Sequence, residues 1–180
     1  MHSALVRPAG PADLGVLAAA LGEPRYFEDR LTRQAAGLGV LLTAWRGPQP
    51  AGVLYLWLED AEEAPIRWHL PRVPLLTHLE VREGLRNQGI GRALVEAAEQ
   101  RLVGDGHERG ALAVRTDNQR AARLYRRLGY RDWGRGTVVC HSFDGVPEAE
   151  PVPELCFVLV KRLVPAGVHQ PSGRAGRDHP

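Results

Sequence analysis

The sequence predicts an α/β fold built around one mixed sheet, and three observations carry this prediction. Runs of β-branched and aromatic residues with strand length alternate with segments whose apolar residues recur at helical spacing. The expected order is a strand pair flanked by helices, then strand, helix, strand and helix, and finally two more strands. The chain has 180 residues, 44% hydrophobic and 24% charged, which is the length and composition of one globular domain.

The first part of the chain carries a short strand and two helices. The strand at 4–7 precedes Asp13, an N-cap residue for an apolar helix that ends at Leu21. A second helix is expected over Glu28–Ala36, where Gly37 closes it.

A hairpin and a third strand follow. The runs Val40–Trp45 and Val53–Leu58 flank Gly47-Pro48-Gln49-Pro50, which is a hairpin signal. An acidic loop, Glu59–Glu63, and a proline-bounded segment then lead to the strand Leu75–Val81.

The remaining elements alternate between helix and strand before the sheet is completed. Apolar residues at positions 90, 94, 98 and 102, and again at 121, 124, 125 and 128, follow the helical template. The expected elements are the helices Ile90–Val103 and Asn118–Leu128 and the strands Ala111–Arg115, Tyr130–Val139 and Leu155–Leu163. We expect one domain over residues 1–163 and a disordered tail over 164–180, which has almost nothing to bury.

Composition and charge exclude several classes of protein. The net charge of +2 is too small to predict a nucleic-acid partner. No apolar run approaches the roughly 18 residues of a membrane helix, and Asp13 falls where a signal peptide needs its apolar core. We therefore expect a cytoplasmic protein in which Cys140 and Cys156 are reduced thiols.

The most informative segment is the glycine-containing loop that follows the strand Leu75–Val81. Gly89 and Gly91 stand where the next helix begins, and neither has a Cβ to keep a ligand from the backbone. The free amides and positive dipole end of a helix start attract phosphate, and Arg86 and Arg92 add positive charge.

Other phosphate-binding motifs do not match. A dinucleotide-binding fingerprint needs a third glycine where Leu94 stands, and a P-loop needs a lysine, whereas Lys161 is the only lysine. A simple tight turn would also explain the two glycines. In the later helix, Asn118 as N-cap and Gly129 as C′ residue have equally ordinary structural interpretations.

The combination of two motifs is more specific than either motif alone. Arg86-x-x-Gly89-x-Gly91, followed by Asn118-x-x-Ala121-Ala122-x-Leu124-Tyr125-x-x-Leu128-Gly129-Tyr130, resembles the signature of the GNAT superfamily of N-acetyltransferases. The detailed similarity runs from about residue 75 to residue 133. It implies a central mixed sheet of about six to seven strands flanked by about four helices. In that family the fourth and fifth strands splay apart, here between Leu79–Val81 and Ala111–Arg115.

The resemblance also implies acetyl-CoA as co-substrate. We expect no metal, because the seven histidines and two cysteines are scattered without zinc-binding spacing. Backbone amides of the glycine loop would bind the pyrophosphate of acetyl-CoA, and the preceding strand its acyl and pantetheine part. The asparagine and the start of its helix would bind the other side of the cofactor arm. The implied cofactor-binding residues are Leu79, Glu80, Val81, Arg86, Asn87, Gln88, Gly89, Ile90, Gly91, Arg92, Asn118, Ala121 and Tyr125.

Amine acetylation sets the remaining chemical requirements. Only about one alkylamine in a thousand is neutral at pH 7, so a proton acceptor is needed. Donors must also stabilise the oxyanion, and the leaving thiolate needs a proton. The resemblance implies the Val81 amide as the oxyanion donor and Tyr125 as the proton donor, although the spacing of Tyr125 also places it on the buried helix face.

The proton acceptor has two main candidates. Strand alternation places His78 and Glu80 on one face, so either could take the proton directly or through water. The acidic loop Glu59–Glu63, which would attract a cationic acceptor, and the absence of any dedicated base remain open. The tryptophans either line the acceptor cavity or pack in the core: Trp45, Trp57 and Trp68.

The expected function is transfer of acetyl from acetyl-CoA to a primary amine of a small molecule or a peptide. A non-catalytic acyl-CoA-binding module and a protein N-acetyltransferase are the alternatives. Arginines between Arg115 and Arg131 could form a nucleic-acid surface, but they lie opposite the apolar stripe with little aromatic interleaving. We therefore expect no nucleic-acid or membrane partner, and a homodimer through an edge strand stays open.

Overall fold

A computed structural model describes residues 4–142 and 152–164. Seven strands form one sheet in the order β1-β2-β3-β4-β5-β7-β6, and five helices and two short 3-10 turns accompany it. The strands are β1 Leu5–Pro8, β2 Gly39–Arg46, β3 Gln49–Trp57, β4 Leu75–Val81, β5 Arg109–Arg115, β6 Arg131–Ser142 and β7 Val152–Arg162. The helices are α1 Leu14–Leu21, α2 Pro24–Ala35, α3 Ala64–His69, α4 Ile90–Gly104 and α5 Gln119–Arg127, with 3-10 turns η1 Pro11–Asp13 and η2 Glu83–Leu85.

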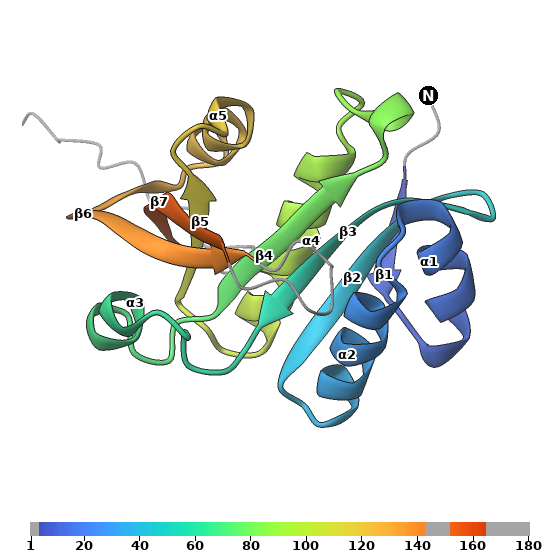
Figure 1. Ribbon diagram of the computed structural model, residues 1–180, viewed down its shortest axis with the longest axis horizontal. Coiled ribbons are helices and arrows are strands. Elements are labelled where there is room, and N and C mark those ends of the chain that lie inside the picture. The colour runs from blue at the N-terminus through green and yellow to red at the C-terminus, as the bar shows by residue number, and fades with distance from the viewer. Residues whose placement is uncertain (1–3, 143–151, 165–180) are drawn as a thin grey trace, which may run out of the picture.

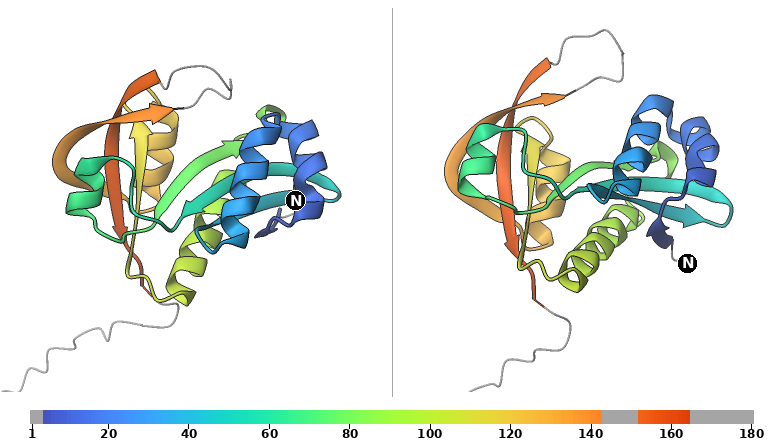
Figure 2. Two further views of the ribbon diagram at one scale, coloured as in Figure 1. Left: turned by 60° about the horizontal axis from the view of Figure 1, so that its bottom comes forward. Right: turned by 90° about the horizontal axis from the view of Figure 1, so that it is seen from below.

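The sheet is mixed, as the sequence predicts. Every neighbouring pair is antiparallel except β4 and β5, which are parallel. Helices α1 and α2 lie on one face of the first four strands and α4 lies on the other (Figures 1 and 2). The predicted α/β class with a mixed central sheet is therefore confirmed.

Apolar side chains fill both faces of the central strands. On the α4 side, Leu94, Ala98 and Leu102 are fully buried against the sheet. On the opposite side, Leu17 of α1 and Phe27 of α2 are equally buried. Because β2 and β3 are covered on both faces, they read as continuous hydrophobic runs, which is why the sequence identifies them.

Two helices, α2 and α3, differ from the sequence-based expectation. Helix α2 begins at Pro24, four residues before the predicted start at Glu28, because proline suits the first helical position and has no amide to satisfy. Helix α3 was not predicted: its six residues, with Pro65 in the first turn, are too few to show a helical period. Its buried Ile66 packs in a small cluster with Leu70 and Val73.

One ion pair connects the far strands to α4. The ammonium of Lys161 on β7 lies 2.8 and 2.7 Å from the two carboxylate oxygens of Glu99 on α4, and the ring of Tyr130 lies beneath it at 5.6 Å. The link between β6 and β7, residues 143–151, lies outside the described residues. The tail expected over 164–180 also lies outside them, except for Val164. The domain limits 1–163 stay a prediction. In the portion that is described, no helix has the length and apolarity needed to cross a membrane.

Leu94→Ala tests whether α4 anchors the sheet. Leu94 is 0% exposed, so truncation should leave a cavity and lower the free energy of unfolding by about 2–5 kcal/mol. Leu5→Ala is the matched control, because that side chain is 64% exposed and its loss should stay within about 0.5 kcal/mol. Urea unfolding of both variants measures the difference, and equal losses would contradict the assigned packing.

Candidate active site

Strands β4 and β5 separate soon after they begin. Their register contains one pair, Leu75 with Ala111, and the Ala111 amide donates to the Pro74 carbonyl at 3.0 Å. Beyond this point the two strands diverge (Figure 1). On its other side β4 stays paired with β3 as far as Val81 opposite Gly52. The predicted splay is confirmed, and it leaves one side of β4 free of strand partners.

The Val81 amide points into this gap. The amide of the next residue, Arg82, donates to the carbonyl of Ala51 in β3 at 3.0 Å, and successive amides of an extended strand point to opposite sides. The Val81 carbonyl on the same side accepts a hydrogen bond from Nε of Arg86 at 3.1 Å. A backbone donor therefore faces the space between the diverging strands.

The loop between β4 and α4 presents further amides. Asn87 (φ 61°) and Gly89 (φ 81°) both adopt left-handed conformations, which turn the chain sharply into the helix. The first hydrogen bond of α4 runs from the Ala93 amide to the Gly89 carbonyl at 3.0 Å. Amides of residues 90–92 precede that bond and have no helical acceptor, so they suit an anion.

Side chains from distant segments hold this loop. Nη2 of Arg120 on α5 donates to Oδ1 of Asn87 at 2.9 Å, and Nη1 of Arg46 on β2 donates to Oε1 of Gln88. With the Arg86 contact to β4, the loop is fixed from three directions. A phosphate would therefore meet positive charge on a preformed backbone.

The two glycines of the motif, Gly89 and Gly91, lie in different surroundings. A Cβ at Gly89 would meet no atom within 4 Å, so its absence leaves open space beside the loop. A Cβ at Gly91 would lie 3.5 Å from Leu124 and 3.8 Å from both Leu79 and Val81. A Cβ at Gly91 would thus make ordinary packing contacts with β4 and α5, whereas Gly89 borders solvent.

The start of α5 lies on the other side of the gap. Oδ1 of Asn118 accepts a hydrogen bond from the Ala121 amide at 3.1 Å, so its role as N-cap is confirmed. Tyr125 is 7% exposed and packs edge-to-face against Tyr130, with ring centroids 5.9 Å apart. Burial raises the pKa of Tyr125, so its phenol is protonated at neutral pH. The structure thus bears out the structural interpretation of both residues, and their cofactor and catalytic roles remain proposals.

Three titratable side chains meet on the α2 side of β4. Nε2 of His78 lies 3.4 Å from a carboxylate oxygen of Glu80 and 3.4 Å from one of Glu23, the residue before α2. The ring of Tyr26 stacks on His78 with centroids 4.0 Å apart and planes at 27°. The expectation that His78 and Glu80 share a face is correct.

Simple strand alternation is nevertheless the wrong reason for that arrangement. Thr77 pairs with Tyr55 and Glu80 pairs with Val53, so two residues of β4 stand opposite one of β3. His78 has φ 49°, and this β-bulge redirects its side chain towards α2. The sequence analysis missed Glu23 and Tyr26, and the Gly22-Glu23-Pro24 helix boundary was the available signal for Glu23.

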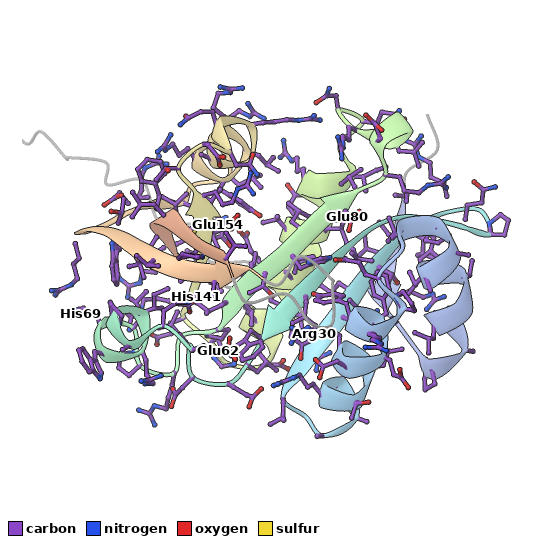
Figure 3. The ribbon with its side chains drawn as sticks, viewed as in Figure 1. Arg30, Glu62, His69, Glu80, His141 and Glu154 are labelled. Carbon is purple, nitrogen blue, oxygen red and sulfur yellow. The ribbon has the colours of Figure 1, made fainter. Side chains whose placement is uncertain are left out.

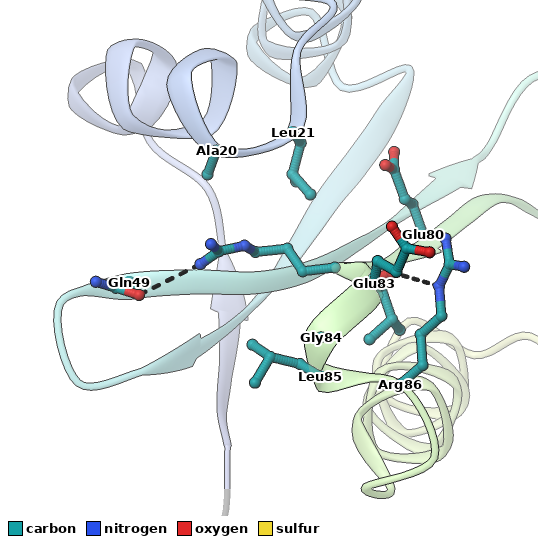
Figure 4. Close-up of a pocket in the computed structure, with 10 residues that line it drawn as sticks. Ala20, Leu21, Gln49, Glu80, Glu83, Gly84, Leu85 and Arg86 are labelled. Carbon is teal, nitrogen blue, oxygen red and sulfur yellow. Dashed lines mark hydrogen bonds between the residues drawn. The ribbon is translucent and has the colours of Figure 1, made fainter.

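A pocket of about 550 Å³ opens beside these groups (Figure 4). Its walls come from the end of α1, the start of β3, the end of β4 and the turn η2. The lining residues are Ala20, Leu21, Gln49, Glu80, Val81, Arg82, Glu83, Gly84, Leu85 and Arg86. The side chains of Glu80 and Arg86 lie side by side at one end of this pocket (Figure 4). Its size falls within the range of small-molecule sites.

Other candidates from the sequence lie elsewhere or are already engaged. Glu59 of the acidic loop pairs with Arg33 at 2.6 Å. Trp45 is 8% exposed and donates to Thr43, whereas Trp68 is 72% exposed on α3. Trp57 packs partly buried against the core. The two cysteines are free thiols, as expected.

The fold and the gap together are typical of one class of protein. Its members have a mixed sheet whose two parallel neighbouring strands separate, with a loop of free backbone amides beside the separation. Residues 15–130 match the model of the acetyltransferase (GNAT) family. The chain belongs to this family, as the sequence motifs indicate.

Individual proteins resemble this chain in sequence or in fold. Mycothiol acetyltransferase of Corynebacterium aurimucosum is 34% identical over 93 residues, which are 45% of this chain and 31% of that protein. The chain thus spans less than a third of that curated relative. PaiA N-acetyltransferase of Thermoplasma acidophilum, solved with coenzyme A, has a TM-score of 0.63 at 15% identity, covering 89% of this chain and 99% of that one. The ribosomal-protein-S18-alanine N-acetyltransferase of Escherichia coli gives 0.64 at 14%, covering 93% and 99%.

Proposed function

We propose that this protein is an acetyl-CoA-dependent N-acetyltransferase that transfers acetyl directly to a primary amine of a small molecule or a peptide. The observation that carries the proposal is the meeting of three features at the end of β4. The Val81 amide faces the gap, the loop beyond it presents free amides, and the His78–Glu80 pair lies on the neighbouring face.

The chain's own residues suit the two ends of acetyl-CoA. The amides of the loop 86–92 and the guanidinium groups around it would hold the pyrophosphate. Leu79 and Val81 on one side, and Asn118, Ala121 and Tyr125 on the other, would flank the pantetheine arm. When bound there, the co-substrate supplies an activated acetyl thioester next to the Val81 amide.

The remaining chemistry follows from what each group can donate or accept. His78 or Glu80 accepts the proton of the acceptor ammonium, which frees the nitrogen lone pair for attack on the thioester carbon. The Val81 amide donates a hydrogen bond to the carbonyl oxygen of the thioester as negative charge develops there. Tyr125 donates its phenolic proton to the sulfur as the carbon–sulfur bond breaks. The attacking nitrogen loses its second proton to solvent, and solvent restores the proton of Tyr125. One ammonium and one thioester thus yield an acetamide, a free thiol and a proton released to water.

The site supports catalysis over mere cofactor binding because proton acceptors lie beside the gap. A non-catalytic acyl-CoA-binding module needs neither the His78–Glu80 pair nor a pocket for an acceptor. A protein N-acetyltransferase would use the same groups with a peptide amine. The alternatives therefore differ in the acceptor and in turnover, which one assay separates.

Tyr125→Phe tests the proposed reaction. The phenylalanine ring keeps the edge-to-face contact with Tyr130 but has no proton to donate, so kcat should fall about a hundredfold while coenzyme A affinity stays within a few-fold. Thiol release from acetyl-CoA across a panel of amines measures the rate. Cofactor binding without amine-dependent release in the unaltered protein would instead identify a binding module.

Gly89→Val tests the anion-binding loop. The new side chain would occupy the open space beside the amides, and the left-handed backbone would cost about 1–2 kcal/mol of stability. Gly106→Val is the matched control, since Gly106 has φ 85° and equal open space at the other end of α4. We expect similar melting shifts in both variants but weaker coenzyme A binding by calorimetry in Gly89→Val alone. Equal affinities would exclude the loop from the cofactor site.

A further inference from the structure

Glu23 is the feature of the site that no motif accounts for. We propose that Glu23 determines acceptor specificity: together with Glu80 it holds the acceptor ammonium and excludes amines that carry a carboxylate next to the amino group. The proposal rests on the proposed acetyltransferase function, because it assigns the acceptor end of the same site.

The geometry brings two carboxylates to one point from different parts of the chain. Glu23 comes from the junction of α1 and α2, and Glu80 from β4. One carboxylate oxygen of Glu23, one carboxylate oxygen of Glu80 and one ring nitrogen of His78 all lie within 4.8 Å of one another. Nε2 of His78 lies between the carboxylates, sealed from solvent and without a hydrogen-bond partner in the described residues. Glu80 also lines the pocket beside Val81, so the cluster borders the expected position of the thioester.

No arginine of the described residues forms an ion pair with Glu23 or Glu80, although Arg86 lines the pocket beside Glu80 (Figure 4). Among the described residues, the carboxylates of Glu23 and Glu80 have only His78 within ion-pair distance. Elsewhere in the same part of the chain, Asp13 pairs with Arg7 at 2.7 Å and Glu59 pairs with Arg33 at 2.6 Å. Two carboxylates outnumber the single imidazole between them, so the cluster has an excess of acidic groups, which attracts a cation and repels an anion.

The nearby guanidinium of Arg30 is directed elsewhere. It lies over the rings of Tyr26 and Tyr55, 4.8 Å from each centroid, and its Nη1 is 3.4 Å from Asp29. Figure 3 shows Arg30 and Glu80 as separate groups along the same face of the sheet. Tyr26 contacts both His78 and Arg30, so its ring forms part of the wall between the acidic cluster and this cation.

The helix does not require Glu23. The residue occupies the N-cap of α2, yet its side chain makes no capping hydrogen bond. Its backbone is left-handed, with φ 52° and ψ 50°, which glycine or asparagine would adopt at lower cost. His78, facing it, is strained in the same way, and such strain gathers at functional sites. A glutamate that neither caps the helix nor suits the turn is explained by what its carboxylate binds.

This arrangement selects a chemical class of acceptor. An alkylamine, an amino-acid amide or a peptide N-terminus presents an ammonium without a neighbouring negative charge. A free α-amino acid carries its carboxylate two bonds from the nitrogen, so binding would bring that carboxylate against Glu23 and Glu80. Specificity of this kind comes from repulsion of the wrong substrate as much as from attraction of the right one.

Matched acceptor pairs test the proposal. Each pair is a free amino acid and its amide with the same side chain, and kcat and KM are measured by thiol release from acetyl-CoA. The unaltered protein should prefer the amide about tenfold or more in kcat/KM. Glu23→Gln should reduce that preference several-fold, mainly by raising KM for the amide. The control Glu28→Gln removes the same charge from an exposed position of α2 and should change nothing.

A second variant guards against misfolding. Asparagine tolerates the left-handed conformation, so Glu23→Asn should melt no lower than the unaltered protein and should show the same loss of preference. Equal turnover of acids and amides by the unaltered protein, or identical behaviour of Glu23→Gln and Glu28→Gln, would overturn the assignment of Glu23 and leave the acetyltransferase function standing. Absence of thiol release with every amine would instead refute the proposed function itself.

A divalent cation is the competing occupant of the cluster. One imidazole nitrogen and two carboxylate oxygens are ligands that Zn²⁺ accepts. Dialysis against a chelator should leave the amide preference unchanged if the cluster binds an ammonium. Loss of the preference, restored by Zn²⁺ in the unaltered protein but not in Glu23→Gln, would overturn the proposal in favour of a metal site.

Discussion

The parting of β4 from β5 is the constraint on which the site depends. Strands inside a sheet normally use both edges for hydrogen bonds, and backbone groups left without partners are costly unless solvent or a ligand supplies them. Here β4 is anchored to β3 along its length, while its other edge is released after one pair. The result is a rigid strand with free donors in the interior of the sheet, a position where preorganised backbone can act on a substrate.

The packing on the two faces of β4 divides the work. On one face Leu79 and Val81 pack against the core and lie close to Gly91 at the start of α4. On the other face the bulge at His78 redirects a polar side chain towards α2. With this bulge, β4 presents apolar side chains towards α4 and an acidic cluster towards α2.

Much of this arrangement was predictable from the sequence, and the reasons differ between elements. Helix α4 and the loop before it are local features, since glycine positions and apolar spacing determine them directly. The splay is a relation between distant strands, and only the family resemblance indicated it. The α3 helix escaped prediction because it has less than two turns of periodicity. Glu23 escaped because its meeting with His78 depends on the bulge and on the early start of α2, neither of which leaves a periodic signal.

The pairing of Lys161 with Glu99 has a practical consequence for the chemistry of the chain itself. Lys161 is the only lysine in the sequence, and both oxygens of Glu99 hold its ammonium. Stray acetylation or amine-directed labelling therefore has a single lysine target, whose side chain is 25% exposed and already paired with Glu99. Acylation of Lys161 would remove the positive charge that Glu99 faces, so a mass increase at Lys161 would identify molecules that have lost the ion pair between β7 and α4.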